Sequence, residues 1–357
     1  MSAPHLILAI NPGSTSTKIG IFRDDAPVTV DNVTHDDAVL ATFPSTVAQK
    51  EYRTRFIRAA IDASGVSIGD LSCCVGRGGM LKPLESGTYR VNDRMVRELE
   101  SGERGGHASN LGAILANDIA APLGIPAFIV DPVVVDEMEP VARLSGLDGL
   151  ERESMSHALN MKAVARRHAK ASGKNYADMR LVIAHLGTGV SLSVHAGGRM
   201  IDVVNPRDEG PFSPERSGSV PALGLARLCF SGGQSYETIE RRLFHNGGFY
   251  SYLGTRDLRK VVAMIAGGDE KAKLVFDAMA YQIAKYIGAM ATVLEGRVDA
   301  ILLTGGMAHE KTLCGEIEKK VCFIAPVTVY PGEDELQALA LGALRVLRGE
   351  EKALDYE

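Results

Sequence analysis

Two similar stretches, one in each half of the chain, place the strongest constraint on its fold. In each stretch an apolar run enters a turn rich in glycine, serine or threonine, and a second apolar run follows. The first joins residues 6–10 to residues 18–22, and the second joins residues 181–184 to residues 191–195. Short apolar runs on both sides of such a turn predict a β-hairpin. Because the pattern occurs twice, and because 357 residues exceed what one hydrophobic core usually serves, we expect two duplicated domains.

Strand-like and helix-like segments alternate along the rest of the chain, which is typical of the α/β class. Further strands are expected at residues 73–75, 127–130, 200–203, 300–303 and 328–330, and helices at residues 54–64, 110–120, 155–171, 272–294 and 335–347. The position of the last helix suggests that the C-terminus packs on the first domain. We therefore expect an N-terminal domain of residues 1–135 plus 336–357 and a second domain of residues 136–335.

The charge, hydropathy and cysteine pattern argue against several classes of protein. The formal net charge is −5 and no long lysine or arginine cluster occurs, so nucleic acid is not an expected partner. The longest apolar stretch, residues 111–135, is interrupted by polar residues and prolines, so no membrane span is expected. The first residues lack a signal-peptide pattern, and the five cysteines show no CxxC spacing. These features predict a cytoplasmic protein whose cysteines are mostly buried, reduced thiols.

The turn at residues 11–18, Asn-Pro-Gly-Ser-Thr-Ser-Thr-Lys, is a candidate phosphate site. Successive backbone N–H groups in a tight turn form a concave nest that binds anions. Ser14 and Ser16 add neutral donors, and Lys18 adds a compact positive charge. The turn holds no aspartate, so Mg²⁺ here would be bound mainly through Asn11 and water. An ordinary hairpin turn is the alternative interpretation, and the Walker A pattern occurs nowhere in the chain.

Two more glycine-containing turns follow predicted strands. One of them contains Gly187 and Gly189, which allow a ligand to approach the backbone closely. The other follows a later apolar strand that ends at Gly305 and Gly306. A buried strand that ends in two glycines commonly binds the adenosine of a nucleotide. Either turn alone is a weak signal, but three such turns at three strand ends are harder to dismiss as ordinary turns.

Two arginines occupy unusual settings. Arg77 lies among three glycines directly after an apolar strand, and Arg216 lies in the proline-containing loop 211–218. A surface ion pair is the usual role of an arginine, but the special backbone residues around both favour a functional placement. Guanidinium groups bind carboxylate and phosphoryl oxygens in a bidentate manner.

These motifs together resemble the acetate/butyrate/propionate kinase family, with matches from Asn11 to Ala340. Residues 11–18 are similar to the butyrate kinase form of that turn. Gly-Arg-Gly-Gly-Met-Leu-Lys-Pro-Leu at residues 76–84 and Gly-His-Ala-Ser-Asn-Leu-Gly at residues 106–112 are also similar to the butyrate kinase versions. The resemblance implies the actin/sugar kinase/heat-shock-chaperone fold, in which two ribonuclease-H-like α/β domains surround a central cleft.

The same resemblance implies roles for individual residues. The catalytic residues would be Arg77, Arg216, Asp131, His185 and His157. The residues that bind the nucleotide and its phosphates would be Asn11, Ser14, Ser16, Lys18, Gly187, Thr188, Gly189, Asp257, Arg259, Gly305, Gly306 and Ala308. Mg²⁺ would be bound by Asn11 and by a carboxylate of the acidic stretch 333–335, in which ungapped matching favours Asp334.

One segment departs from the family pattern. Acetate kinases carry His-Gly-Thr-Ser-His, whose first histidine is associated with stabilisation of the transition state, whereas residues 153–157 read Glu-Ser-Met-Ser-His. His157 matches the second histidine, but Glu153 replaces the first. Charge stabilisation would therefore fall on His185 and the two arginines. For His157 and for His107, a structural hydrogen-bonding role is an equally good interpretation.

The implied reaction is the ATP-dependent phosphorylation of butyrate to butyryl phosphate, together with the reverse, ATP-forming reaction. A carboxylate is already ionised at neutral pH, so direct in-line transfer needs no general base. Another short carboxylate (isobutyrate, propionate or acetate) is the nearest alternative acceptor. A hydroxyl-directed kinase, in which Asp131 would act as the base, and a chaperone-like ATPase of the same fold also stay open. The expected partners are ATP or ADP, Mg²⁺ and the carboxylate, and a homo-oligomer, dimer or higher, is expected.

Overall fold

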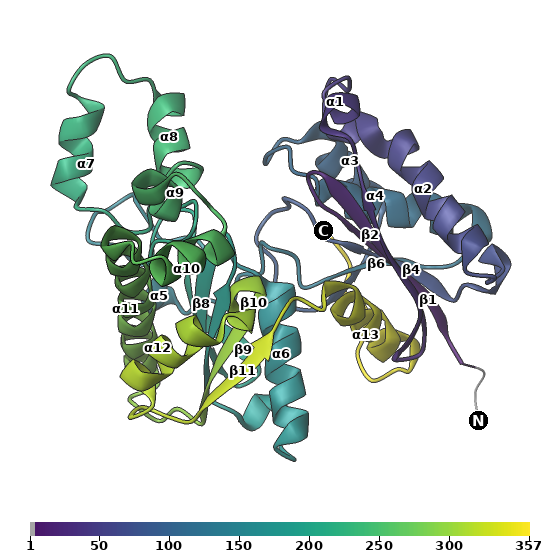
Figure 1. Ribbon diagram of the computed structural model, residues 1–357. Helices are drawn as coiled ribbons and strands as arrows, with labels where there is room; N and C mark the ends of the chain where they lie inside the picture. Colours follow the sequence, from purple (N-terminus) through teal and green to yellow (C-terminus); the bar gives the residue numbers. More distant parts are fainter. Residues whose placement is uncertain (1–3) are drawn as a thin grey trace. The chain divides into compact units, whose positions relative to one another are not determined.

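The computed structural model describes residues 4–357 (Figure 1). The chain divides into two compact units. Unit 1 consists of Met1–Asp136 together with Asp334–Glu357, and unit 2 consists of Glu137–Glu333. Each unit contains one mixed β-sheet with helices on both faces, so the predicted α/β class is confirmed.

The sheet of unit 1 has the strand order β3-β2-β1-β4-β6-β5. Its strands are β1 (Leu6–Pro12), β2 (Ser16–Arg23), β3 (Ala26–Thr34), β4 (Cys73–Arg77), β5 (Thr88–Arg90) and β6 (Ala127–Val130). The first three form an antiparallel meander that contains the first predicted hairpin. β4 pairs in parallel with β1, and β6 pairs in parallel with β4. β1 and β4 are apolar on both faces because helices cover both sides of this part of the sheet.

The α-helices of unit 1 are α1 (Asp37–Leu40), α2 (Lys50–Ala63), α3 (Asp93–Ser101), α4 (Asn110–Ala120) and α13 (Glu335–Leu347). Ile57 of α2 and Leu111 of α4 share one core with Leu8 and Ile10 of β1. α13, from the other end of the chain, contacts β1, β2, β4 and β6, and lies across the sheet from α4 (Figure 1). The bounds of α4, β6 and α13 are those that the sequence predicted.

The sheet of unit 2 repeats this plan, with the strand order β11-β10-β7-β8-β9. Its strands are β7 (Leu181–Leu186), β8 (Val190–Ala196), β9 (Arg199–Val204), β10 (Ala300–Gly305) and β11 (Val327–Pro331). β7, β8 and β9 form the second antiparallel meander, β10 pairs in parallel with β7, and β11 pairs in parallel with β10. Both sheets therefore combine a meander with parallel strands, which confirms the duplication predicted from the two hairpins.

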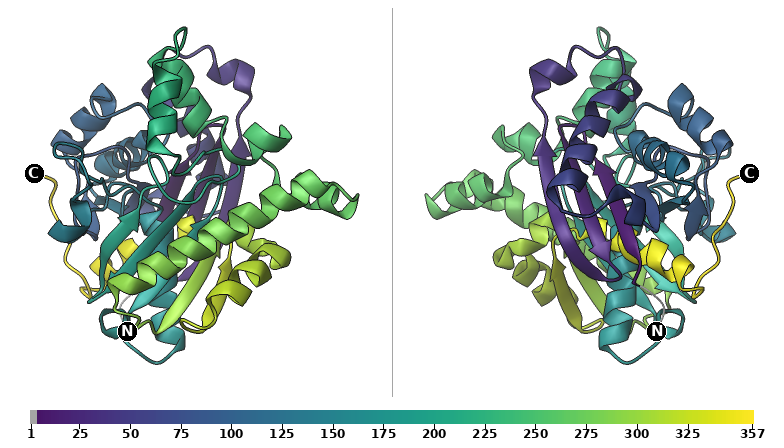
Figure 2. Two further views of the ribbon diagram at one scale, coloured as in Figure 1. Left: turned by 90° about the vertical axis from the view of Figure 1, so that its left-hand side faces the viewer. Right: turned by 90° about the vertical axis from the view of Figure 1, so that its right-hand side faces the viewer.

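The α-helices of unit 2 are α5 (Pro140–Arg143), α6 (Ala158–Ala171), α7 (Ala222–Cys229), α8 (Tyr236–Phe244), α9 (Gly248–Leu253), α10 (Leu258–Ala266), α11 (Glu270–Val293) and α12 (Lys311–Val321). The long helix α11 runs along the sheet beside α12, and α6 packs on β7 and β10 (Figures 1 and 2). α6 begins three residues later than predicted. His157 is the N-cap residue of α6, so it precedes the first helical residue, and its ring forms a hydrogen bond with Ser191.

No helix within residues 4–357 is both long and apolar enough to cross a membrane. All five cysteines lie in this range and are unpaired. Cys73, Cys74 and Cys314 are buried, whereas Cys229 and Cys322 are exposed, so the prediction of mostly buried thiols is confirmed.

Candidate active site

The turn between β1 and β2 is shorter than the sequence indicated. β1 continues to Pro12 and β2 begins at Ser16, so only residues 13–15 lie outside the strands. Asn11, which the sequence placed in the turn, is therefore a strand residue, and Lys18 is a strand residue as well. They pair directly across the two strands, which puts their side chains on the same face of the sheet.

Within this turn the backbone N–H groups of Ser14 and Thr15 donate to no acceptor in the described chain. Both residues are exposed, and Ser16 is half-buried. Unpaired N–H groups beside hydroxyl groups in a tight turn are an arrangement that binds anions. The geometry is therefore compatible with phosphate binding by Ser14 and Ser16, which stays a prediction.

Arg77 belongs to a small charged cluster in unit 1. It ends β4 where this strand touches α4, and a Cβ atom on Gly76 would lie only 2.0 Å from the carbonyl oxygen of Gly112. Arg77 Nη1 lies 2.5 Å from Glu335 Oε1. The side-chain amide of Asn11 donates a hydrogen bond to the other carboxylate oxygen of Glu335. Glu335 is buried at the start of α13, so the cluster joins residues from β1, β4 and α13.

The carboxylate beside Asn11 is that of Glu335, whereas the sequence favoured Asp334 for the metal. Asp334 is the N-cap residue of α13. No group of three or more His, Cys, Asp or Glu side chains within residues 4–357 is arranged to bind a metal ion. Mg²⁺ commonly uses one or two carboxylates plus substrate phosphates and water. The oxygen donors of Asn11 and Glu335 therefore fit such an ion chemically.

Asp131 lies at the same edge of the sheet as Arg77, because Arg77 pairs with Val130 and Asp131 is the next residue. Its backbone has a positive φ of 38°, which is uncommon for a residue other than glycine and is found more often at functional sites. The side chain is buried, and Oδ1 accepts hydrogen bonds from Ser86 Oγ at 2.6 Å and from Gly87 N at 3.0 Å. These bonds hold the carboxylate in one orientation.

In unit 2 the two predicted catalytic histidines lie against each other. The rings of His157 and His185 stack with centroids 3.7 Å apart and an angle of 6° between their planes. His185 Nδ1 lies 2.9 Å from Asn160 Oδ1, and His157 Nδ1 lies 2.8 Å from Ser191 Oγ. His185 Nε2 lies 3.0 Å from Glu333 Oε1, but the two groups are not aligned as a hydrogen bond requires. The His185 ring is thus fixed by neighbours and keeps one nitrogen without a hydrogen bond.

Arg216 is half-buried beside the turn that contains Gly189. Its guanidinium lies 4.3 Å above the centre of the Phe244 ring, and a Cβ atom on Gly189 would lie 2.4 Å from Arg216 Nη1. Burial lowers the pKa of the Arg216 guanidinium, and the nearby charge of Glu215 partly opposes this effect. Arg216 Nε is buried and has no hydrogen-bond partner in the described part of the chain. A buried donor without a partner is costly, so this group favours an anionic ligand.

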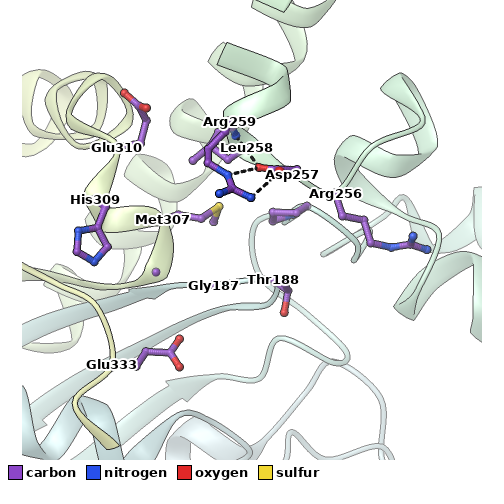
Figure 3. A pocket seen from close by; sticks show the side chains of 12 residues that line it. Gly187, Thr188, Arg256, Asp257, Leu258, Arg259, Met307, His309, Glu310 and Glu333 are labelled. Carbon is purple, nitrogen blue, oxygen red and sulfur yellow. Dashed lines mark hydrogen bonds and ion pairs between the residues drawn. The ribbon is translucent and has the colours of Figure 1, made fainter. Parts of the chain in front are cut away.

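A cavity of about 950 Å³ opens beside this turn (Figure 3). Its lining residues are Gly187, Thr188, Pro214, Arg256, Asp257, Leu258, Arg259, Gly306, Met307, His309, Glu310 and Glu333. Asp257 caps α10 by accepting a hydrogen bond from Arg259 N, and it forms an ion pair with the Arg259 side chain at 2.8 Å. The hydrogen bond from Arg259 lowers the pKa of Asp257. Five residues predicted to bind nucleotide therefore line one cavity: Gly187, Thr188, Asp257, Arg259 and Gly306.

Three of the residues predicted to bind nucleotide lie in unit 2 but outside this lining. Gly189 lies under the Arg216 guanidinium. Gly305 ends β10 with a φ of 90°, and a Cβ atom there would lie 2.5 Å from the carbonyl oxygen of Leu186. Ala308 is buried in the 3₁₀ helix Gly306–His309. Gly189 and Gly305 permit close packing near the cavity rather than forming its surface.

Some lining residues were missed in the sequence. Arg256 directly precedes Asp257, and Glu310 follows Ala308 by two positions, so only this closeness to predicted residues could have pointed to them. Arg256 stacks over the ring of Tyr250 at 3.8 Å. No local signal distinguishes either residue from an ordinary charged surface residue.

His107 and Glu153 also have defined surroundings. His107 Nδ1 lies 2.8 Å from Ser109 Oγ, which is a local contact before α4. Glu153, at the position where the acetate kinase pattern has a histidine, lies close enough to Asp208 to act on its charge. Burial is the main cause of the raised pKa of Asp208, and the Glu153 carboxylate adds to it.

Several solved structures share this architecture. The chain superposes on an acetate kinase from Porphyromonas gingivalis with a TM-score of 0.77 and 21% identity, covering 96% of this chain and 100% of that one. A propionate kinase from Francisella tularensis gives 0.73 and 17% over 94% and 98% of the two chains. An acetate kinase from Entamoeba histolytica gives 0.74 and 16% over 94% and 98%. The chain therefore shares its fold with these kinase structures.

The sequence itself adds a family signal. Residues 150–322, which lie within unit 2, match the sequence profile of the Acetokinase family. This segment contains His157, His185, Arg216 and most of the residues that line the cavity.

Proposed function

We propose that this chain is a kinase of the Acetokinase family that transfers a phosphoryl group from ATP to a short-chain carboxylate, and that butyrate is its acceptor. The observation that carries the proposal is the cavity of unit 2. Five residues predicted to bind nucleotide line it, and Arg216, whose buried Nε has no hydrogen-bond partner in the described residues, lies beside it, all within the segment that matches the Acetokinase profile.

The cavity would bind ATP. Its volume of about 950 Å³ suits a small-molecule site. Gly187, Thr188 and Gly189 would bind the phosphates through backbone N–H groups, because a glycine-containing turn lets these groups approach anionic oxygens. The adenosine would lie between the N-terminus of α10 and the segment that follows β10. Unit 2 would thus be the nucleotide-binding domain.

Unit 1 would supply groups for the acceptor, the phosphoryl group and Mg²⁺. Arg77 would bind the carboxylate, and the turn at residues 13–15 with Lys18 would bind phosphoryl oxygens. Mg²⁺, when bound, would neutralise charge on the phosphates, and the contact between Asn11 and Glu335 supports these two residues as its protein ligands. Asp334 stays the alternative carboxylate.

The chemistry requires positioning and charge neutralisation rather than a strong base. A short-chain carboxylate has an ordinary pKa of about 4 and is ionised at neutral pH. Arg77, Arg216 and His185 would offset repulsion between the acceptor and the phosphoryl oxygens. The bonds from Ser86 and Gly87 to Asp131 suit an orienting role for its carboxylate. We therefore propose direct in-line transfer without a phosphoenzyme, which also allows the ATP-forming direction.

The choice of butyrate rests on residues 11–18, 76–84 and 106–112, whose residues resemble the butyrate kinase versions of these motifs. The test is to incubate the purified chain with ATP, Mg²⁺, hydroxylamine and acids of two to five carbons. Hydroxylamine traps acyl phosphates as hydroxamates. Hydroxamate with the four-carbon acids alone supports butyrate or isobutyrate as the acceptor. Hydroxamate with acetate or propionate instead identifies that acid as the acceptor. ATP hydrolysis without any hydroxamate contradicts the carboxylate kinase.

The homo-oligomeric state and the cytoplasmic location stay predictions. α7 has no buried residue although it is mostly apolar, which supports burial in an assembly. Light scattering on the purified chain measures its oligomeric state directly.

A further inference from the structure

A fully buried arginine lies behind the turn that joins β1 to β2. Arg53, on α2, has an exposed fraction of 0%. Its Nη1 donates to the carbonyl oxygens of Gly13 at 2.9 Å and Ser16 at 2.8 Å, and its Nη2 donates to that of Ser14 at 3.1 Å. One guanidinium group therefore binds three carbonyl groups of the candidate phosphate turn.

A second buried residue completes this inner layer. The carbonyl oxygen of Thr15 accepts a hydrogen bond from the backbone N–H of His35 at 2.8 Å. The hydroxyl of Thr17 lies 2.8 Å from His35 Nε2 and accepts from Arg53 Nη1 at 2.9 Å. Every carbonyl group of residues 13–16 is thus bound by another group of unit 1.

The orientation of these carbonyl groups decides where the N–H groups lie. In a planar trans peptide, the C=O of one residue and the N–H of the next lie on opposite sides of the chain, and the described chain has no cis peptide. Arg53 binds the carbonyls of Gly13 and Ser14, so the N–H groups of Ser14 and Thr15 are directed away from it. These are the two N–H groups that donate to no acceptor in the described residues.

Arg53 also lacks a counter-charge. No carboxylate in residues 4–357 lies within ion-pair distance of it, and its remaining donors go to the neutral amide oxygen of Gln49 at 2.9 and 3.1 Å. Burial lowers the pKa of its guanidinium below the usual value. A buried cation without an anion is unfavourable, and an anion bound on the outer side of the turn would offset this cost.

We propose that Arg53 is a positioning residue that holds the turn in its anion-binding conformation and acts as the fixed counter-charge of the phosphoryl group bound there. The idea rests on the proposed function for the identity of the anion. The anion binding itself is measured with inorganic phosphate and does not depend on turnover.

Two substitutions separate the parts of the proposal. Gln49→Glu places a carboxylate where the amide now accepts from Arg53, so it neutralises the buried charge and keeps the hydrogen bonds and the fold. Arg53→Lys keeps the charge, but an ammonium has three donors and lacks the planar fork that binds several carbonyls at once. Arg55→Met is the matched control, because Arg55 lies on the same helix and is exposed, and the change in net charge equals that of Gln49→Glu.

The assay follows the backbone N–H signals of Ser14 and Thr15 by NMR during titration of the ¹⁵N-labelled full chain with inorganic phosphate. We expect Gln49→Glu to raise the dissociation constant at least tenfold, with a melting temperature no lower than that of the wild type. Arg53→Lys should raise it several-fold, and Arg55→Met should leave it within twofold. A dissociation constant for Gln49→Glu within twofold of the control overturns the counter-charge role.

Kinetics separate this proposal from the proposed function. If the wild type forms acyl hydroxamate, Gln49→Glu should raise the KM for ATP at least tenfold with a smaller change in kcat. An unchanged KM for ATP would overturn the role of Arg53 and leave the proposed function standing. If the wild type forms no hydroxamate but phosphate still binds in a manner that depends on Gln49 and Arg53, the anion site stands and the carboxylate kinase fails.

Discussion

The contact between Gly189 and Arg216 allows a test in which a single added methyl group displaces a proposed catalytic side chain. In Gly189→Ala the new Cβ would lie 2.4 Å from Arg216 Nη1 and 2.7 Å from Cζ. Ordinary van der Waals contact begins at 3.4 Å, so the guanidinium must move away by 3.4 − 2.4 = 1.0 Å. The clashing atoms are the end of a flexible side chain, and Gly189 does not have a positive φ. The fold should therefore accept the substitution.

A displacement of this size is large on the scale of catalysis. Misplacement of a catalytic group by about 1 Å costs roughly 100-fold in rate. We therefore expect kcat for hydroxamate formation to fall about 100-fold. The KM for ATP should change little, because the cavity lining lies mostly outside this contact. Initial rates at saturating ATP and carboxylate, together with a melting curve, measure both quantities.

Two controls show whether the effect passes through Arg216. Gly315→Ala, on α12 in the same unit, adds a methyl group that meets no atom within 4 Å and should leave kcat unchanged. Arg216→Ala should itself lower kcat with a cost of roughly 3–4 kcal/mol. In that background Gly189→Ala should add almost nothing, since the two changes remove one interaction. A kcat for Gly189→Ala within threefold of the wild type, or fully additive effects, would refute the reasoning.

Two further substitutions test other parts of the molecule. Arg77→Ala removes the ion-pair partner of Glu335 and should raise the KM for the carboxylate at least tenfold more than the KM for ATP. Steady-state rates with each substrate varied measure both constants. Equal changes in the two constants contradict the role of Arg77 at the acceptor. His195 is fully buried, and burial lowers its pKa well below 6.5. As the pH falls below 6.5, His195 therefore stays neutral in the folded chain but takes up a proton in the unfolded chain. This residue should therefore reduce the free energy of unfolding by up to about 1.4 kcal/mol for each pH unit below 6.5, and His195→Gln should remove that part of the slope in urea unfolding curves. Parallel slopes for the wild type and this variant would show that His195 does not carry the effect.

Much of the local structure could be predicted from the sequence, because short-range patterns determine it. The alternation of apolar residues with glycine-rich turns was enough to predict both hairpins, and helical spacing was enough to predict the bounds of α4 and α13. The glycines at residues 187, 189, 305 and 306 marked the strand ends of unit 2, where the cavity lies. These signals depend only on neighbours within a few positions along the chain.

Only the tertiary structure decided which side chains meet. Gln49 and Arg53 look like ordinary polar residues of a surface helix, yet the Arg53 guanidinium is buried against Gly13, 40 positions earlier. Glu335, rather than Asp334, contacts Asn11, 324 positions away. Glu335 is the first residue of α13 and Asp334 is its N-cap. The position at which the helix begins therefore sets the direction in which each of these two side chains points. Long-range pairing of this kind depends on how helices pack on a sheet, which no local pattern encodes.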